Sequence, residues 1–315
     1  MRTSPAESAA RPAGSVVGSI GGTPLVELPR FARGAARLLA KLEWFNPGGS
    51  VKDRIARAMI DDAEERGLLK PGGTIVEATS GNTGVALALI AAVRGYRCVV
   101  VMPEGYGLVK ASLMSAAGAE VVRTSAEEGM RGAIARADEI LRSTPGAHLP
   151  GQFHNPVNPR AHYETTGPEI AEQAGGRIDA WVAGVGTTGT FTGVARYLGE
   201  RHPGILRVAV EPQGSILTGG EQGPHEVEGI GLSQIWPILD RSLIDEIITV
   251  PDTPAFETCR RLAREEGLFA GGSSGAAAAA ALEIARRLGP GKTVVTLFPD
   301  GAERYPGQGI FGTSA

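Results

Sequence analysis

The sequence predicts an α/β fold in which mostly parallel β-sheets are covered by helices. Short runs rich in β-branched residues alternate with stretches of helical periodicity along most of the 315 residues, a pattern typical of parallel sheets. Glycine is frequent, with 45 residues, and it clusters where the predicted strands end. Because an α/β sheet binds ligands at the carboxyl ends of its strands, these glycine-rich turns are the candidate functional segments.

Strands and helices are expected in regular alternation. In the first half, strands are predicted at 37–44, 73–78, 97–102 and 119–124, followed by helices at 50–67, 82–94, 109–117 and 129–141. In the second half, strands are predicted at 179–185, 207–212 and 292–299, with helices at about 190–200, 257–266 and 274–288. Residues 211–241 have little periodicity and many Gly and Pro, so we expect a long loop near the ligand site.

The composition is that of a globular chain with no nucleic-acid or membrane partner. The apolar content is 42% and the net charge is −3, and no apolar run approaches the roughly 20 residues that span a bilayer. Residues 1–15 are rich in Ser, Ala and Pro without an apolar core, so they predict a flexible arm rather than a signal peptide.

Cysteine and histidine usage indicates neither disulfides nor a metal. Cys98 and Cys259 lie in a strand-like and a helical segment, which favours packing roles in a reducing cytoplasm. The five histidines show no pair at metal-ligand spacing. We therefore expect a cytoplasmic protein with no metal in its chemistry.

Lys52 lies in a glycine-rich turn, NPGGSVKDR (46–54), that leads from a strand-like run into an amphipathic helix. Only five of the 31 basic residues are lysines, so a lysine at this position favours a chemical role. Lysine can lose its proton and form a Schiff base, whereas arginine effectively cannot. Taken alone, Lys52 is better explained as a lysine without function at the start of a helix, and the other turns reverse that preference.

The turn that begins GVGTTGTFTG at Gly184 follows a predicted strand and opens a helix. Its backbone N–H groups and the positive end of the helix converge on one point, which is an anion-binding arrangement. The turn is rich in hydroxyls that can donate to phosphate oxygens: Thr187, Thr188 and Thr190. These hydroxyls favour a compact terminal phosphate as the bound anion.

The same turn is also compatible with a dinucleotide-binding site. Gly184, Gly186 and Gly189 satisfy G-x-G-x-x-G, and Glu211 ends the next predicted strand about twenty residues later. On this turn alone, an NAD-dependent oxidoreductase is the competing interpretation.

Two further turns join a strand to a helix and carry hydroxyl groups. EATSGNTGVALAL (77–89) crowds four polar side chains around two glycines: Thr79, Ser80, Asn82 and Thr83. Such a turn can bind a carboxylate, although an ordinary helix N-cap is the alternative. FAGGSSG (269–275) presents Ser273 and Ser274 at another helix start. A reactive lysine, a phosphate cradle, a carboxylate cradle and a hydroxyl donor together suggest pyridoxal phosphate and an amino-acid substrate.

These motifs resemble the cysteine synthase and cystathionine β-synthase family of pyridoxal phosphate enzymes. The similarity runs from IGGTPLVEL at Ile20 to GAERY at Tyr305. It implies the two-lobed fold type II architecture, which is similar to the tryptophan synthase β chain, and a homodimer. We expect a larger cofactor-binding lobe at 16–45 and 143–315 and a smaller mobile lobe at 46–142.

The resemblance implies a role for each candidate residue. Lys52 is expected to form the Schiff base, and Ser273 is expected to meet the pyridine nitrogen. The residues expected to bind the phosphate are Gly186, Thr187, Thr188, Gly189 and Thr190. The residues expected to bind the substrate carboxylate are Thr79, Ser80, Asn82, Thr83 and Gln152, with the Asn82 amide also near the phenolic oxygen of the cofactor.

A neutral serine at the pyridine nitrogen does not enforce its protonation, so β-elimination and replacement are favoured over transamination. In the implied reaction, Lys52 removes the α-proton of an O-activated serine as the β-substituent leaves. A nucleophile, most simply sulfide, then adds at Cβ. A lysine that serves as anchor and general base must be neutral when it is released.

Subfamily motifs point in two directions. GTTGT and the segment 152–170 resemble cysteine synthase B, whereas 211–217, 224–231 and 239–245 resemble cystathionine β-synthases, which accept serine and homocysteine. EGYGLVKASLM (104–114) replaces a basic stretch that is usual in the family. The main prediction is O-acetylserine plus sulfide to cysteine. The alternatives are cystathionine formation and another β-substituted alanine made from O-acetylserine or O-phosphoserine.

Overall fold

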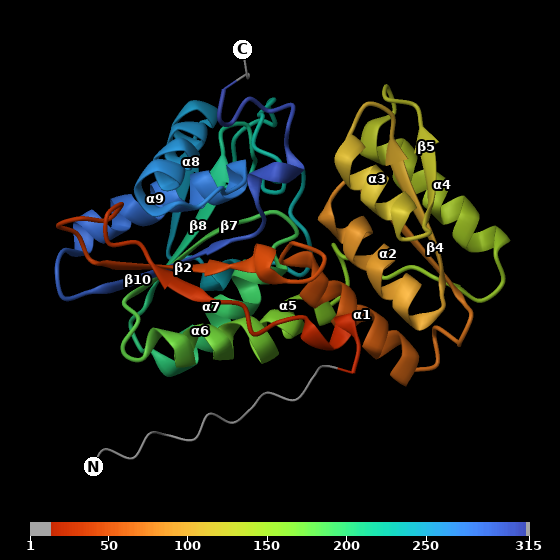
Figure 1. Cartoon of the computed structure of the whole chain (residues 1–315), viewed down its shortest axis with the longest axis horizontal. Helices are drawn as coiled ribbons and strands as arrows, with labels where there is room; N and C mark the ends of the chain where they lie inside the picture. Colours follow the sequence, from red (N-terminus) through yellow and green to blue (C-terminus); the bar gives the residue numbers. More distant parts are fainter. Residues whose placement is uncertain (1–13, 313–315) are drawn as a thin grey trace.

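A computed structural model describes residues 14–312, so the arm expected at 1–15 lies almost entirely outside the described residues. Two groups of helices and strands lie side by side, each around its own sheet (Figure 1). Both sheets are parallel apart from one edge strand. The predicted α/β class with helix-covered parallel sheets is confirmed.

The larger sheet has six strands in the order β1-β2-β10-β7-β8-β9. Its strands are β1 (Leu25–Glu27), β2 (Arg37–Leu42), β7 (Ala180–Gly184), β8 (Leu206–Pro212), β9 (Glu246–Val250) and β10 (Thr293–Phe298). The helices of this half are α5 (Val157–Ala161), α6 (Gly167–Ala174), α7 (Gly189–Arg201), α8 (Asp252–Glu266) and α9 (Gly272–Leu288).

The smaller sheet has four parallel strands in the order β5-β4-β3-β6. These are β3 (Thr74–Ala78), β4 (Arg97–Pro103), β5 (Glu120–Thr124) and β6 (Ala147–His148). The helices of this half are α1 (Lys52–Glu65), α2 (Asn82–Arg94), α3 (Leu108–Ala116) and α4 (Gly129–Ser143). The sheet therefore extends past residue 142, where the smaller lobe was expected to end.

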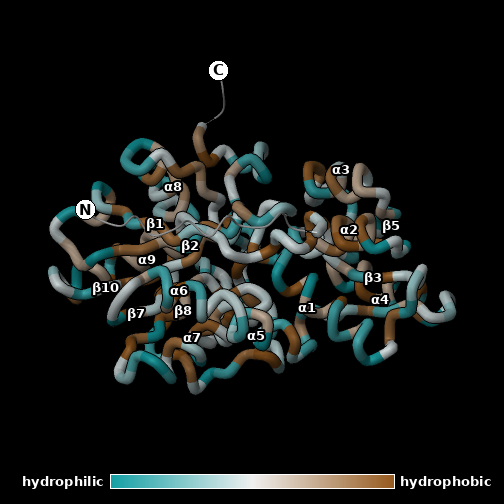
Figure 2. The backbone as a smooth tube through the Cα atoms, turned by 60° about the horizontal axis from the view of Figure 1, so that its bottom comes forward, coloured by the Kyte–Doolittle hydropathy of each residue, from teal (hydrophilic) through white to brown (hydrophobic). Residues whose placement is uncertain are grey.

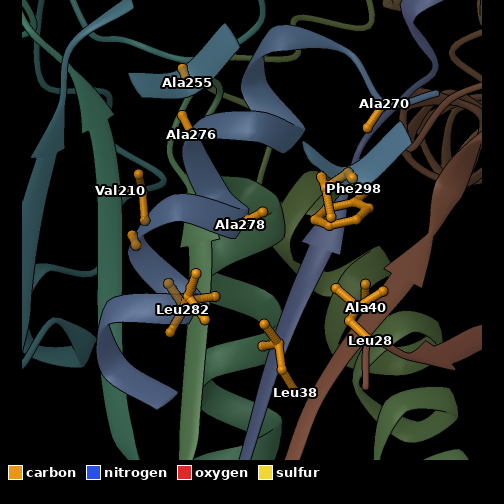
Figure 3. Packing of buried hydrophobic residues seen from close by; sticks show 14 of the residues in the cluster. Leu28, Leu38, Ala40, Val210, Ala255, Ala270, Ala276, Ala278, Leu282 and Phe298 are labelled. Carbon is orange, nitrogen blue, oxygen red and sulfur yellow. The ribbon is translucent and has the colours of Figure 1, made fainter. Parts of the chain in front are cut away.

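Alternating residues of the strands separate the core of the larger sheet into two layers. On β7, Ala180 and Val182 pack in the cluster that contains α9, whereas Trp181 and Ala183 pack in the cluster that contains α7. The run of small alanines on α9 lets this helix lie close to the strands, with Ala278 and Leu282 above them (Figure 3). This packing fixes the start of α9 against the carboxyl end of the sheet.

Helix α1 connects the two halves and is amphipathic. Its tube changes repeatedly between hydrophobic and hydrophilic colour (Figure 2). Ile55, Met59 and Ile60 recur at helical spacing and are fully buried, as expected for a helix with one core-facing side.

The structure corrects several predicted boundaries. The strand expected at 37–44 ends at Leu42, because Glu43–Phe45 form a 3₁₀ helix. The helix expected from 257 begins five residues earlier, at Asp252. β1, β6 and β9 were not predicted, because they are short or lie at sheet edges.

Helices α5 and α6 were also missed, because they contain prolines that read as loop breakers. They are joined through a π-helical turn, His162–Thr166, so the chain stays helical from Val157 to Ala174, although Pro168 has no N–H to donate. The long loop expected between β8 and Arg241 is present.

No helix in residues 14–312 combines the length and the apolar character that a membrane crossing requires.

Candidate active site

A cavity opens where the carboxyl ends of β7 and β10 meet the starts of α1, α2 and α9. This is the edge at which parallel α/β sheets bind ligands. Seven of the twelve candidate residues line it: Lys52, Asn82, Gly186, Thr187, Thr188, Thr190 and Ser273. Segments that are more than 200 residues apart in the chain thus form one site.

The other five candidates lie outside the lining of this cavity. Gly189 is buried at the start of α7, and a Cβ placed on it would lie 1.9 Å from Asn158 Oδ1. Thr83 donates its hydroxyl proton to Gln152 Oε1 at 2.6 Å, so these two residues are held together. Thr79 accepts a hydrogen bond from Gly81 N at 3.2 Å within the turn before α2, and Ser80 is half-buried in the same turn.

Lys52 is the first residue of α1, and its side chain is half-buried because one side faces the cavity. The preceding residue is fixed to the end of the larger sheet, since Val51 N donates to Pro299 O at 2.9 Å. Desolvation lowers the pKa of Lys52 to about 8, against an opposing effect of the Asp300 carboxylate. A substantial share of this amine is therefore neutral near physiological pH, as a base or nucleophile requires.

The amide of Asn82 is oriented by two charged neighbours from the C-terminal segment. Its Nδ2 donates to Asp300 Oδ2, and its Oδ1 accepts from Arg304 Nη1 at 3.0 Å. Carboxylates only accept and guanidinium groups only donate, so the amide has one orientation. Arg304 also donates to Gly48 O in the turn before Lys52. The C-terminal segment therefore joins the Lys52 turn to the start of α2.

The hydroxyl-rich turn after β7 has the features of an anion cradle. Thr188 has φ +74°, and it is the one non-glycine residue with positive φ in the part of the chain that the structure describes. Such a conformation is costly for a β-branched residue and typically marks a functional site. Its buried Oγ1 has no hydrogen-bond partner among residues 14–312. A Cβ on Gly186 would lie 2.3 Å from Gly229 O, so only glycine fits there.

Two residues that support this turn were not singled out from the sequence. Asn158 is fully buried, and its Nδ2 donates to Gln152 O at 2.7 Å and to Thr187 Oγ1 at 3.3 Å. His162 Nε2 lies 3.1 Å from Thr190 Oγ1. Burial lowers the pKa of His162 well below its usual range, so its imidazole is neutral. The sequence feature that could have identified Asn158 is its position in the NP-x-NP pattern.

The dinucleotide interpretation finds no support in the position of Glu211. Its carboxylate accepts from Leu217 N at 2.9 Å and from Thr218 N at 3.1 Å, and the residue is 1% exposed. A ribose-binding acid has to face the ligand. Glu211 instead fixes the start of the long loop.

A family described as pyridoxal-phosphate dependent enzyme matches residues 16–300. The chain belongs to this family. A pyridoxal phosphate enzyme needs a lysine and a phosphate cradle in one cavity, and Lys52 and the turn around Thr188 meet that need. The Thr188 hydroxyl at the start of α7, which has no hydrogen-bond partner within residues 14–312, is the feature that fits a phosphate most directly.

Known pyridoxal phosphate enzymes resemble the chain over nearly its full length. A cysteine synthase of Staphylococcus aureus (strain Mu50 / ATCC 700699) is 50% identical over 300 residues, which cover 94% of this chain and 96% of the relative. The structure of an O-acetylserine dependent cystathionine β-synthase from Helicobacter pylori matches with a TM-score of 0.90 and 44% identity, covering 96% of this chain and 100% of that one. The structure of an O-ureido-L-serine synthase matches with a TM-score of 0.92 and 45% identity, covering 96% of both chains.

This pyridoxal phosphate enzyme is therefore of the cysteine synthase type, and its substrates are small molecules. In residues 14–312, no group of three or more His, Cys, Asp or Glu side chains is placed to hold a metal ion.

Proposed function

We propose that the enzyme catalyses β-replacement on O-acetylserine, with sulfide as the nucleophile and L-cysteine as the product. The observation that carries this proposal is that Lys52 and Ser273 line one cavity together with the turn around Thr188. With Ser273 at the pyridine nitrogen, as the resemblance implies, bound pyridoxal phosphate would have no charged partner at that atom. This environment supports elimination and replacement at Cβ rather than transamination.

The chain's own residues divide the work of the reaction. Bound pyridoxal phosphate supplies the electron sink that acidifies the α-proton of the substrate. Lys52 accepts that proton and later returns it to the same carbon. The Thr83–Gln152 pair and the Asn82 amide orient the substrate carboxylate, and the turn around Thr188 binds the phosphate through N–H and hydroxyl donors.

Product analysis tests this proposal directly. The purified enzyme is given O-acetylserine with sulfide, with homocysteine, or with neither, and amino-acid products are measured by chromatography. We expect cysteine to form with the highest kcat/KM in the sulfide reaction. If O-acetylserine is not consumed with any nucleophile, while serine or O-phosphoserine is, the proposed donor is wrong.

Cystathionine formation is the second candidate, because one of the similar structures is named an O-acetylserine dependent cystathionine β-synthase. Two of the segments that bear on the subfamily, 104–114 and 224–231, also meet in space. Lys110 of α3 pairs with Glu228 of the long loop at 2.8 Å, and the adjacent Gly229 and Ile230 line the cavity. We propose that this contact lies on the nucleophile side of the site.

The expected homodimer and the expected closure of 46–142 over the substrate remain proposals. Size-exclusion chromatography with light scattering tests the first. Small-angle scattering with and without O-acetylserine tests the second.

Thr190→Ala is expected to weaken pyridoxal phosphate binding by about 1.5 to 3 kcal/mol, because a hydroxyl donor to a charged phosphate is lost. The dissociation constant is measured by titrating the cofactor-free protein with pyridoxal phosphate. Thr190→Ser is the matched control and should bind close to the parent, since it retains the hydroxyl near His162. An alanine variant with the affinity of the parent would show that Thr190 does not contact the phosphate.

The rate of β-replacement is expected to rise with pH and to level off above about pH 8. Desolvation lowers the pKa of Lys52 to about 8, and only the neutral form of the amine can accept the α-proton. Below this value kcat should fall up to tenfold for each pH unit. The measurement is kcat for O-acetylserine between pH 6 and pH 9.5, and a flat profile in this range contradicts Lys52 as the base.

A further inference from the structure

Asp300 is a buried carboxylate in the cavity, and the proposed function gives it no role. It is 1% exposed and follows β10, at the carboxyl edge of the larger sheet. Among the described residues that line the cavity, Asp300 is the one carboxylate and Lys52 is the one cation. A charge pair within a desolvated cavity interacts far more strongly than the same pair in water.

The backbone fixes Asp300 beside the Lys52 turn. Ser50 and Asp300 form an antiparallel bridge, and Val51 N donates to Pro299 O at 2.9 Å. These main-chain contacts lie one and two residues before Lys52. The backbone therefore holds the segments that carry Asp300 and Lys52 next to each other, and both side chains line the cavity.

Two donors hold the carboxylate of Asp300, and both bind the same carboxylate oxygen. Its Oδ2 accepts from Asn82 Nδ2 and from the Tyr305 hydroxyl. Its Oδ1 is buried and has no hydrogen-bond partner within residues 14–312. Burial favours the protonated form and raises the pKa of Asp300, whereas the two donors favour the ionised form.

Other charged groups surround this pair from each neighbouring element, and several of them are engaged with partners. Lys110 of α3 lies 4.1 Å from the centroid of the Tyr305 ring and pairs with Glu228. Asp53 on α1 accepts from Gly48 N at 2.5 Å. Arg304 contacts Asn82 and Gly48, and the neutral His162 contacts Thr190. Asp300 is the group whose charge opposes the desolvation of Lys52.

We propose that Asp300 is a positioning residue that acts through Lys52: its carboxylate, held by Tyr305 and Asn82, sets how tightly Lys52 retains its proton. The proposal rests on Lys52 as the base of the proposed reaction. Without this carboxylate the amine loses its proton more readily, and the enzyme keeps less of the ammonium form that returns the proton to the substrate.

The test is a titration of Lys52 in the parent chain and in Asp300→Asn, both full-length and free of cofactor. The rate at which acetic anhydride acetylates Lys52 is followed against pH by peptide mass spectrometry, with the exposed Lys70 as an internal reference. The pH at which this rate reaches half of its maximum is the Lys52 midpoint. In Asp300→Asn we expect this midpoint to fall by about one pH unit, the lower end of the effect of a neighbouring opposite charge. The rise of kcat with pH in the cofactor-loaded variant should move in the same direction.

Asp179→Asn is the matched control. Asp179 directly precedes β7, at the amino ends of the strands and so on the side of the sheet away from the cavity, where it pairs with Lys292 at 3.2 Å. The same change of charge there should leave the Lys52 midpoint where it is in the parent. A midpoint in Asp300→Asn that also equals that of the parent would overturn the proposal.

Tyr305→Phe provides a second variant that leaves the carboxylate in place, in case Asp300→Asn does not fold. Loss of the hydroxyl donor should leave Asp300 protonated to a higher pH and lower the Lys52 midpoint, by less than Asp300→Asn does. A midpoint that stays unchanged or rises in Tyr305→Phe counts against the proposal. If the parent consumes no serine derivative but the midpoints still shift as expected, the proposed function fails and the role of Asp300 stands.

Discussion

Replacing Lys52 by alanine is expected to abolish β-replacement, with a loss of at least about 10³-fold in kcat. Proton transfer by a positioned base contributes roughly 10² to 10⁴ by itself, and the variant also loses the covalent link to the cofactor. The fold should survive, because alanine is a good helix former at the start of α1. The measurement combines kcat with the mass of the protein after borohydride treatment, which fixes the cofactor on the lysine in the parent.

The controls separate chemistry from folding. Lys52→Arg retains a cation but cannot form the link, so it should be as inactive as the alanine variant. Lys70→Ala removes an exposed lysine and should behave as the parent. Because folding lowers the pKa of Lys52 from 10.5 to about 8, the lysine costs stability that builds up as the pH falls through this range and is fully present at pH 7, so the alanine variant should be no less stable at pH 7. Cofactor fixed by borohydride in Lys52→Ala would show that another lysine is the anchor.

Replacing Arg54 by leucine is expected to destabilise the protein by about 3 to 5 kcal/mol, the range for removing one partner of a buried ion pair. The guanidinium is 1% exposed and donates to Glu43 at 2.6 and 2.9 Å and to Glu169 at 2.8 Å twice. Without it, the two carboxylates lose their shared donor, and Glu43 stays fully buried. The measurement is the free energy of unfolding in urea, monitored by circular dichroism.

A surface pair provides the comparison for Arg54. Arg66 pairs with Asp62 at 3.0 Å, but its side chain is 64% exposed, so Arg66→Leu should cost no more than about 1 kcal/mol. Adding Glu43→Gln to Arg54→Leu should recover part of the loss, because it removes an unpaired charge. Equal destabilisation by Arg54→Leu and Arg66→Leu would contradict the buried network.

The ion pairs of Arg54 with Glu43 and Glu169 also predict how the stability of the protein depends on pH. Burial alone would raise the pKa of Glu169, but hydrogen bonds and charge from Arg54 lower it to about 2. A carboxyl with a depressed folded pKa contributes stability that is present above its ordinary pKa and is lost as the pH falls toward 2. In Arg54→Leu, this loss of stability on acidification should be smaller than in the parent.

Much of the site could be predicted from the sequence, because its main parts are contiguous. Each glycine-rich turn carries its own donors at a strand end, and the turns considered together indicated Lys52, the turn around Thr188 and Ser273. Helix α2 also begins at Asn82, as predicted. Prolines in 156–168 hid two helices, since the π-helical turn that accommodates them depends on packing against α7.

By itself, the sequence determined the α/β class, the family and the turns in which backbone N–H groups and hydroxyls converge. The strand order was decided only by the tertiary structure. It places β10 between β2 and β7, so that Asp300 meets Asn82 across 218 residues of chain and Arg54 meets Glu169 across 115. The physical reason is that a turn's hydrogen bonds follow from nearby residues, whereas contacts between distant segments follow from which strands pair and how the helices pack across them.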